Sequence, residues 1–222
     1  IMGYLDDNES GISTQSLDVA IGRLPAKSLA EAELMVDKIE GYMMRRDLTS
    51  GESGVTGDWR NYVALLADDA DPSHPGDTIF AHSSEYAANM IKLRYPNINI
   101  DRLYADSYHQ QSGAIGSFYP DLNNALRQRI NYGCLLLNYI GHGSSRYIGT
   151  ERYIEPSDIA TYTNRDRLPL VVTSTCSYGR QDSPDELSGA ELFILSENGA
   201  IGVVSATRKV SHVQRFNTDV MV

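Results

Sequence analysis

The chain has 222 residues, enough for one large domain or for one domain plus part of another. Its 41% apolar and 22% charged residues are ordinary for a globular protein and argue against disorder. A net charge of −10 argues against nucleic acid or an anionic membrane surface as the natural partner. No apolar run reaches the ~18–20 residues that cross a bilayer, so we expect no transmembrane segment.

The first predicted element is a helix over residues 29–46. Ser28 and Glu31 have the spacing of a capping box, and apolar residues recur behind them at helical intervals. The polar stretch 49–57 reads as a linker, and a new unit begins near Trp59. We therefore expect two units, 1–57 and 58–222. Because the chain begins at Ile1 rather than Met, we expect it to be a piece of a longer protein, cut short at the C-terminal end of the second unit.

Strands and helices alternate through the second unit. Strands are predicted at 62–67, 99–105, 134–140, 168–175 and 200–205, and helices at 83–94, 121–132 and 186–198. The strands are mostly apolar rather than alternating, which indicates that both faces of the sheet are covered. The fold class is therefore α/β, with a parallel sheet and helices on both faces.

Two residues with catalytic potential follow neighbouring predicted strands. His142 lies in a glycine-rich segment after strand 134–140, and Cys176 follows strand 168–175. An imidazole beside a thiol can remove its proton and create a nucleophile. The N–H groups of Gly143 and Cys176 could then stabilise an oxyanion. Taken singly, each side chain is more typical of a structural role. Their joint placement at one edge of the sheet, with a glycine-rich loop at one of them, makes catalysis an equal alternative.

The remaining candidates are less specific. Cys134, in an apolar run, is expected to be a buried and inert thiol, so Cys176 should be free. The acidic loop after strand 62–67 has several interpretations. Asp69 and Asp71 could serve a metal-dependent phosphatase, or Asp68, Asp69 and Asp71 could bind calcium. Alternatively Asp69, or Asp68, could orient His142 as the third group of a triad.

An ordered set of motifs resembles the gingipain family of cysteine peptidases over nearly the whole chain. The segment around the histidine is Asn138-Tyr139-Ile140-Gly141-His142-Gly143-Ser144, and Cys176 follows it. Further family-like segments are Gly3-Tyr4-Leu5-Asp6-Asp7-Asn8-Glu9, Ile21-Gly22-Arg23-Leu24-Pro25, Gly57-Asp58-Trp59-Arg60-Asn61 and Thr173-Ser174-Thr175-Cys176. The resemblance implies a caspase-like catalytic domain preceded by the end of a smaller subdomain.

The resemblance also implies roles for individual residues. Cys176 would form the acyl-enzyme, His142 would shuttle the proton, and Gly143 with the Cys176 backbone would form the oxyanion hole. Asp69 would support the histidine, and Arg208 and His212 would line the substrate cleft. No metal and no cofactor would be needed.

Within the family the motifs look most like the branch that serves type IX secretion. Such proteins act at the bacterial outer-membrane surface, with other secretion-system proteins, on the C-terminal signal domains of exported cargo. The stretch 78–83, where arginine-cleaving members carry an acidic specificity residue, has no carboxylate. This favours the secretion branch over a gingipain-like secreted protease, and a non-catalytic docking component of the secretion apparatus is a further alternative.

Overall fold

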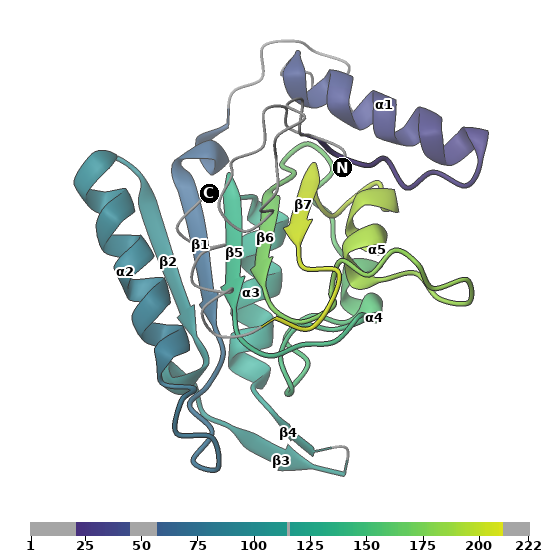
Figure 1. Cartoon of the computed structure of the whole chain (residues 1–222). Helices are drawn as coiled ribbons and strands as arrows, with labels where there is room; N and C mark the ends of the chain where they lie inside the picture. Colours follow the sequence, from purple (N-terminus) through teal and green to yellow (C-terminus); the bar gives the residue numbers. More distant parts are fainter. Residues whose placement is uncertain (1–20, 45–56, 115, 211–222) are drawn as a thin grey trace, which may run out of the picture.

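The computed structural model of the chain describes residues 21–44, 57–114 and 116–210. In this part of the chain one five-stranded parallel sheet has the order β2-β1-β5-β6-β7 (Figure 1). Its strands are β1 (Tyr62–Ala67), β2 (Asn99–Tyr104), β5 (Leu136–Ile140), β6 (Leu170–Ser174) and β7 (Gly202–Ser205). The predicted parallel α/β fold is confirmed.

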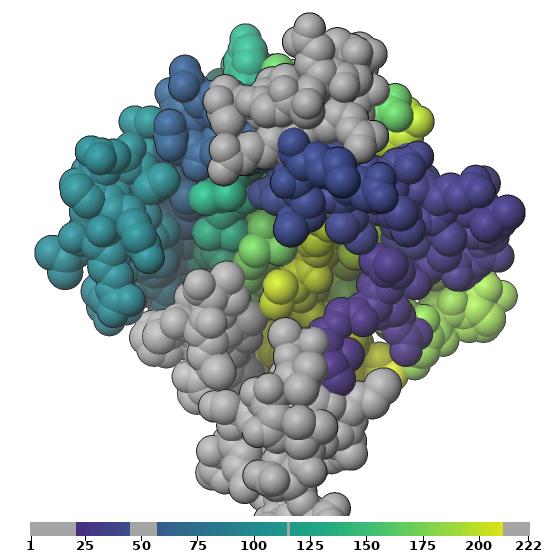
Figure 2. All heavy atoms as spheres, turned by 90° about the horizontal axis from the view of Figure 1, so that it is seen from above, coloured from purple at the N-terminus to yellow at the C-terminus, as the bar shows by residue number. Residues whose placement is uncertain are grey.

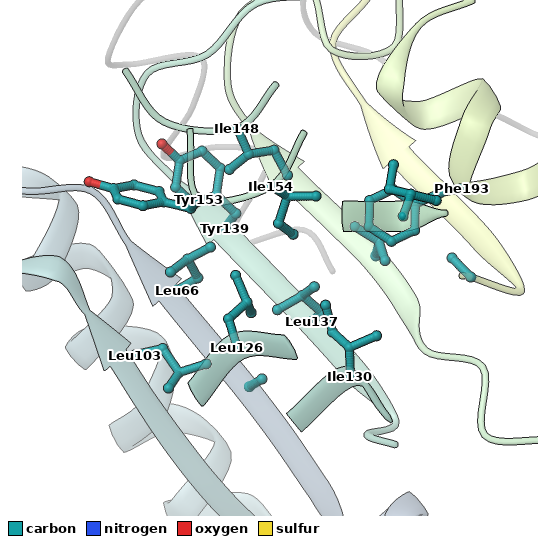
Figure 3. Packing of buried hydrophobic residues seen from close by; sticks show 14 of the residues in the cluster. Leu66, Leu103, Leu126, Ile130, Leu137, Tyr139, Ile148, Tyr153, Ile154 and Phe193 are labelled. Atoms are coloured by element: carbon teal, nitrogen blue, oxygen red, sulfur yellow. The ribbon is translucent and has the colours of Figure 1, made fainter. Parts of the chain in front are cut away.

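Helices cover both faces of the sheet. The helices of the described residues are α1 (Leu29–Met43), α2 (Ile79–Arg94), α3 (Pro120–Tyr132), α4 (Pro156–Ile159) and α5 (Gly189–Leu195), with 3₁₀ turns at Asp58–Asn61 and Ala105–Ser107. Successive strand side chains point to opposite faces. Val63 and Leu65 accordingly cluster with Ala88 of α2, whereas Ala64 and Leu66 belong to the larger core that α3, α4 and α5 complete (Figure 3).

The strand order places a topological switch between β1 and β5. The chain runs outward from β1 through α2 to β2, then returns through α3 to β5 on the other side of β1. Because such crossovers are right-handed, α2 lies on the face opposite α3. The loops that follow β1 and β5 diverge at this point, which is where open α/β sheets bind ligands.

Most element boundaries match the sequence prediction within a few residues. The capping box at Ser28 and Glu31 is present. Helix α2 begins at Ile79 instead of residue 83, because buried Phe80 packs edge-on against the His142 ring and adds a turn. The antiparallel hairpin of β3 (Gln111–Gly113) and β4 (Gly116–Phe118) was not expected, and neither was α4. Each is too short to give a periodic signal.

Helix α1 packs at the end of the sheet opposite the β3–β4 hairpin (Figure 1). Figure 2, seen from that end, shows α1 spread across it. The buried Lys38 ammonium donates to the carbonyls of Ile194 and Ser196 at the C-terminal end of α5, at 2.8 and 2.7 Å. Most of the predicted linker 49–57 and the motif at residues 3–9 lie outside the described residues, so the division at 57/58 stays a prediction.

The described helices include none that is long and apolar enough to cross a bilayer.

Candidate active site

The register of β5 and β6 brings the two candidate catalytic residues to the same edge of the sheet. Ile140 pairs with Ser174 at the carboxyl ends of these parallel strands. His142 and Cys176 each follow two residues later (142 − 140 = 2; 176 − 174 = 2). The alignment continues beyond the strands, since Gly141 N–H donates to the Ser174 carbonyl at 3.4 Å. Neighbouring parallel strands lie about 4.8 Å apart, so the loops that carry the imidazole and the thiol are adjacent.

The two cysteines have different surroundings. Cys176 is partly exposed, with its Sγ 3.8 Å from the Val210 carbonyl, and neither cysteine forms a disulfide. Ser177, directly after it, has φ of 59°, a left-handed conformation that turns the chain sharply beyond the thiol. Cys134 is fully buried, and burial raises the pKa of its thiol to about 12. The expectation that Cys134 is buried is therefore confirmed.

The carboxylate that holds the His142 ring is Asp77. Its Oδ2 lies 3.1 Å from His142 Nε2, and its side chain is only 4% exposed. A carboxylate at Nε2 places the ring proton there and leaves Nδ1 as the basic nitrogen. Asp77 lies one residue before the N-cap Thr78 of α2, and the N-terminal end of a helix favours a negative charge.

From the sequence we expect Asp69 to orient the imidazole, whereas in this structure the carboxylate on the ring is that of Asp77. Asp69 Oδ2 instead accepts hydrogen bonds from the hydroxyl of Tyr119 at 2.7 Å and from the Gln110 amide at 3.3 Å. Asp68, the alternative, does contact His142, but through the backbone: its Oδ2 accepts the His142 N–H at 2.6 Å. The loop turns these two aspartates toward the core and presents the later Asp77 to the ring.

The three aspartates proposed as a calcium site do not converge either. Asp71 turns away to accept hydrogen bonds from Ser73, which lower its pKa to about 2. In its place Glu151 joins Asp68 and Asp69, each offering an oxygen within 4.8 Å of the others. Burial raises the pKa of all three carboxyls, that of Glu151 to about 7 with added repulsion from Asp69. Asp71 does not belong to this group of carboxylates, so the arrangement gives no support to a phosphatase site built on Asp69 and Asp71.

The backbone of the histidine loop is held tightly. A side chain at Gly141 would place its Cβ 2.3 Å from the Tyr139 hydroxyl and 2.4 Å from Asp68 Cβ, so only glycine fits there. Gly143 forms an isolated antiparallel bridge with Ile148. The hydrogen bonds of this bridge run from Ser144 N–H to the Tyr147 carbonyl and from Gly149 N–H to the His142 carbonyl. In the described part of the chain the Gly143 N–H itself makes no hydrogen bond. It is a donor available to an oxyanion.

A cavity of about 450 Å³ opens beside His142, at the β1/β5 switch point. Four carboxylates line it, together with His74 and His142; they belong to Asp69, Asp71, Asp77 and Glu151. The stretch 78–83 holds no carboxylate, but Asp77 immediately before it does line this cavity. The surroundings of the histidine are thus more acidic than that stretch indicates.

The expected cleft residues are only partly described. The exposed Arg208 guanidinium pairs with Asp182 at 2.6 Å, and the Arg208 carbonyl accepts the N–H of Ser177, next to Cys176. A role in substrate binding stays a prediction. His212 lies outside the described residues.

The fold is similar to solved cysteine peptidases. The crystal structure of the Arg-specific cysteine proteinase gingipain R (RgpB) matches with a TM-score of 0.69 and 18% identity, over 90% of this chain and 42% of that one. The complex of Porphyromonas gingivalis RgpB pro- and mature domains matches with a TM-score of 0.68 and 18% identity, over 90% and 43%. A structure described as a protease matches with a TM-score of 0.60 and 17% identity, over 86% and 37%.

The chain thus spans less than half the length of each of these structures. No curated protein sequence matches it. At this identity the structural likeness defines the class of fold, the caspase-like α/β domain of gingipains. The sequence defines the family: residues 2–221 match peptidase family C25, and the chain belongs to this family of cysteine peptidases.

Proposed function

We propose that the chain carries the catalytic centre of a cysteine endopeptidase or transpeptidase, with Cys176 as nucleophile and His142 as its base. The observation that supports this most is that His142 and Cys176 each lie two residues beyond a paired position at the carboxyl ends of β5 and β6. The buried carboxylate of Asp77 also contacts the imidazole. The available N–H of Gly143 and membership of the C25 family agree with it.

The chemistry follows from these positions. His142 Nδ1 takes the thiol proton, and the Cys176 thiolate attacks the carbonyl carbon of a peptide bond. Negative charge on the carbonyl oxygen is stabilised by the N–H groups of Gly143 and Cys176. The C–N bond breaks, the amine leaves with the proton from His142, and a thioester remains on Cys176. Water or an amine then attacks the thioester, a proton passes to His142, and the thiol is released. These steps use only the chain's own residues.

Within this chemistry we propose the role of PorU, the sortase of type IX secretion. Its substrates are exported proteins with a C-terminal signal domain, and its place is the outer-membrane surface among other secretion-system proteins. The motif resemblance around 138–144 and 173–176 supports this assignment. Cleavage of a cargo protein in the presence of an amine distinguishes the outcomes by mass spectrometry. A new amide at the cleaved carboxyl end indicates transfer, whereas a free carboxylate only would indicate a hydrolytic secreted protease.

The catalytic proposal itself is tested with methyl methanethiosulfonate, which forms a mixed disulfide with a thiolate and releases methanesulfinate. We expect rapid labelling of Cys176 at pH 6–7 in the full-length protein, and slow labelling in His142→Ala, because the thiol then loses its base. Peptide mapping separates Cys176 from Cys134. Equal labelling rates in both proteins would contradict the proposal and favour a non-catalytic docking component.

A further inference from the structure

The peptide unit between His142 and Gly143 contains both the carbonyl of the base residue and the N–H of the proposed oxyanion hole. Its carbonyl oxygen accepts two hydrogen bonds, from the Tyr139 hydroxyl at 2.6 Å and from Gly149 N–H at 3.0 Å. In a planar trans peptide the C=O and the N–H point in opposite directions. Fixing the His142 carbonyl therefore fixes the direction of the Gly143 N–H.

Tyr139 is itself immobilised. It belongs to β5, is fully buried, and lies edge-on to the ring of Tyr153 with centroids 6.3 Å apart. Figure 3 shows the two rings with their hydroxyl groups directed to the same side. The Tyr153 hydroxyl donates to Asp68, which in turn accepts the His142 N–H. The ring of Tyr139 cannot swing away without disturbing this buried group, so its hydroxyl is a fixed donor.

Packing on the other side of Gly143 links the same peptide to the nucleophile. A Cβ on Gly143 would lie 2.6 Å from Thr175 Oγ1 and 3.0 Å from the Tyr147 carbonyl. Thr175 is fully buried and directly precedes Cys176. Gly143 is thus confined beside the segment that carries the thiol, and a small rotation of its peptide would misdirect the N–H.

We propose that Tyr139 is a positioning residue for the oxyanion hole: its hydroxyl holds the His142 carbonyl and thereby aims the Gly143 N–H at the oxygen of the tetrahedral intermediate. The inference rests on the proposed function, since it concerns the same reaction. It assigns to Tyr139 an effect on the stabilisation of the intermediate and none on the formation of the thiolate.

The test is Tyr139→Phe in the full-length protein, which removes one hydroxyl and leaves Gly149 N–H on the carbonyl. Fluorescent casein serves as substrate, and methyl methanethiosulfonate, which has no carbonyl oxygen, serves as a probe of the thiolate. We expect kcat for casein to fall about 10- to 100-fold, less than or comparable to the loss of a whole oxyanion donor. KM should stay within about twofold, and the rate and pH profile of labelling should be unchanged.

Tyr178→Phe is the matched control. Tyr178 is also fully buried, and its hydroxyl makes no hydrogen bond in the described part of the chain. This variant should keep wild-type turnover. Thermal unfolding of both variants reports on the fold.

Three results would overturn the inference. One is unchanged casein turnover in Tyr139→Phe. Another is an equal fall of turnover and labelling, which would mean that the hydroxyl acts on the formation of the thiolate by His142 and Cys176. The third is loss of the fold in Tyr139→Phe but not in Tyr178→Phe, which would make the hydroxyl structural. Failure of His142-dependent labelling in the wild type is a separate result and would reject the proposed function itself.

Discussion

The carboxylate of Asp77 determines how His142 can act as a base. It is almost completely buried, and it holds the imidazole at Nε2 so that Nδ1 can receive a proton. The ring is further confined by the edge-on contact with Phe80 at 5.3 Å. A neutral amide in place of the carboxylate would permit the wrong tautomer and would no longer stabilise the imidazolium.

We therefore expect Asp77→Asn to lower kcat/KM for casein by about 10²- to 10⁴-fold, in line with the loss of a buried triad carboxylate. Labelling of Cys176 by methyl methanethiosulfonate should slow as well, because less thiolate forms. The control is Asp69→Asn, which changes a carboxylate bound to Tyr119 and Gln110 and should keep most of the activity. A larger loss in Asp69→Asn than in Asp77→Asn would restore the interpretation of Asp69 as the orienting group.

Asp77 shows why the site could be predicted only in part. His142 and Cys176 each follow an apolar strand, so the alternation of elements was enough to place them at one edge. Asp77 lies 65 residues before His142, in a loop whose path depends on the turn at 74–77 and on the burial of Phe80. No periodic pattern encodes such a path. Asp68 and Asp69 lie closer to the strand end and were favoured for that reason.

At the scale of elements, α1 is attached to the rest of the molecule through the end of α5. Lys38 reaches two carbonyls of the α5 C-terminal turn, where the helix leaves acceptors unpaired. Nearby, the guanidinium of Arg60 lies over the rings of both Tyr42 and Trp59, which joins α1 to the segment before β1.

Lys38→Met keeps the length of the side chain and removes both hydrogen bonds. We expect the free energy of unfolding to fall by about 1–3 kcal/mol at pH 7, measured by urea denaturation. Burial lowers the pKa of Lys38 to about 8, so between about pH 8 and 10.5 the unfolded chain binds more protons. The wild type should therefore gain stability as the pH rises through this window, and Lys38→Met should not.

Lys27→Met is the control, since Lys27 is exposed and, among the described residues, only its backbone N–H is hydrogen-bonded, to Glu31. An equal loss of stability in both variants would contradict the role given to Lys38.

The elements themselves follow from the sequence where their pattern is long. Apolar runs predict the strands β1, β5, β6 and β7, and the capping box predicts the start of α1. The β3–β4 hairpin has three residues in each strand, exposed or half-buried, and its pairing is set by contact rather than by composition. Short elements of this kind carry too few apolar positions to stand out.

For the molecule as a whole, the partly buried cluster of Asp68, Asp69 and Glu151 at the β1/β5 switch point should set a pH dependence of stability. Asp68, Asp69 and Glu151 all have raised pKa values, with that of Glu151 at about 7. Between about pH 4.5 and 7 the folded state therefore binds more protons than the unfolded chain, and stability should fall as the pH rises.

We expect Glu151→Gln to weaken this fall, because one of the three ionisations is removed. The variant should match the wild type near pH 5 and exceed it at pH 8, as measured by urea denaturation across this range. Glu33→Gln, on an exposed position of α1, should leave the profile unchanged. A Glu151→Gln variant less stable than the wild type at pH 8 would contradict this expectation. It would show that the fold stabilises the charged form of the Glu151 carboxylate.

At the switch point, the nucleophile and base come from different loops than most of the residues that line the cavity. The imidazole and the thiol follow β5 and β6, whereas the loop between β1 and α2 supplies five of the ten residues that line the cavity and lies outside the pairing of those strands. The side chains at positions 71, 72 and 74 can thus change while His142 and Cys176 keep their register and Asp68 and Asp77 keep their contacts with His142. Selectivity could diversify at these positions by point mutation, without rebuilding the reactive centre.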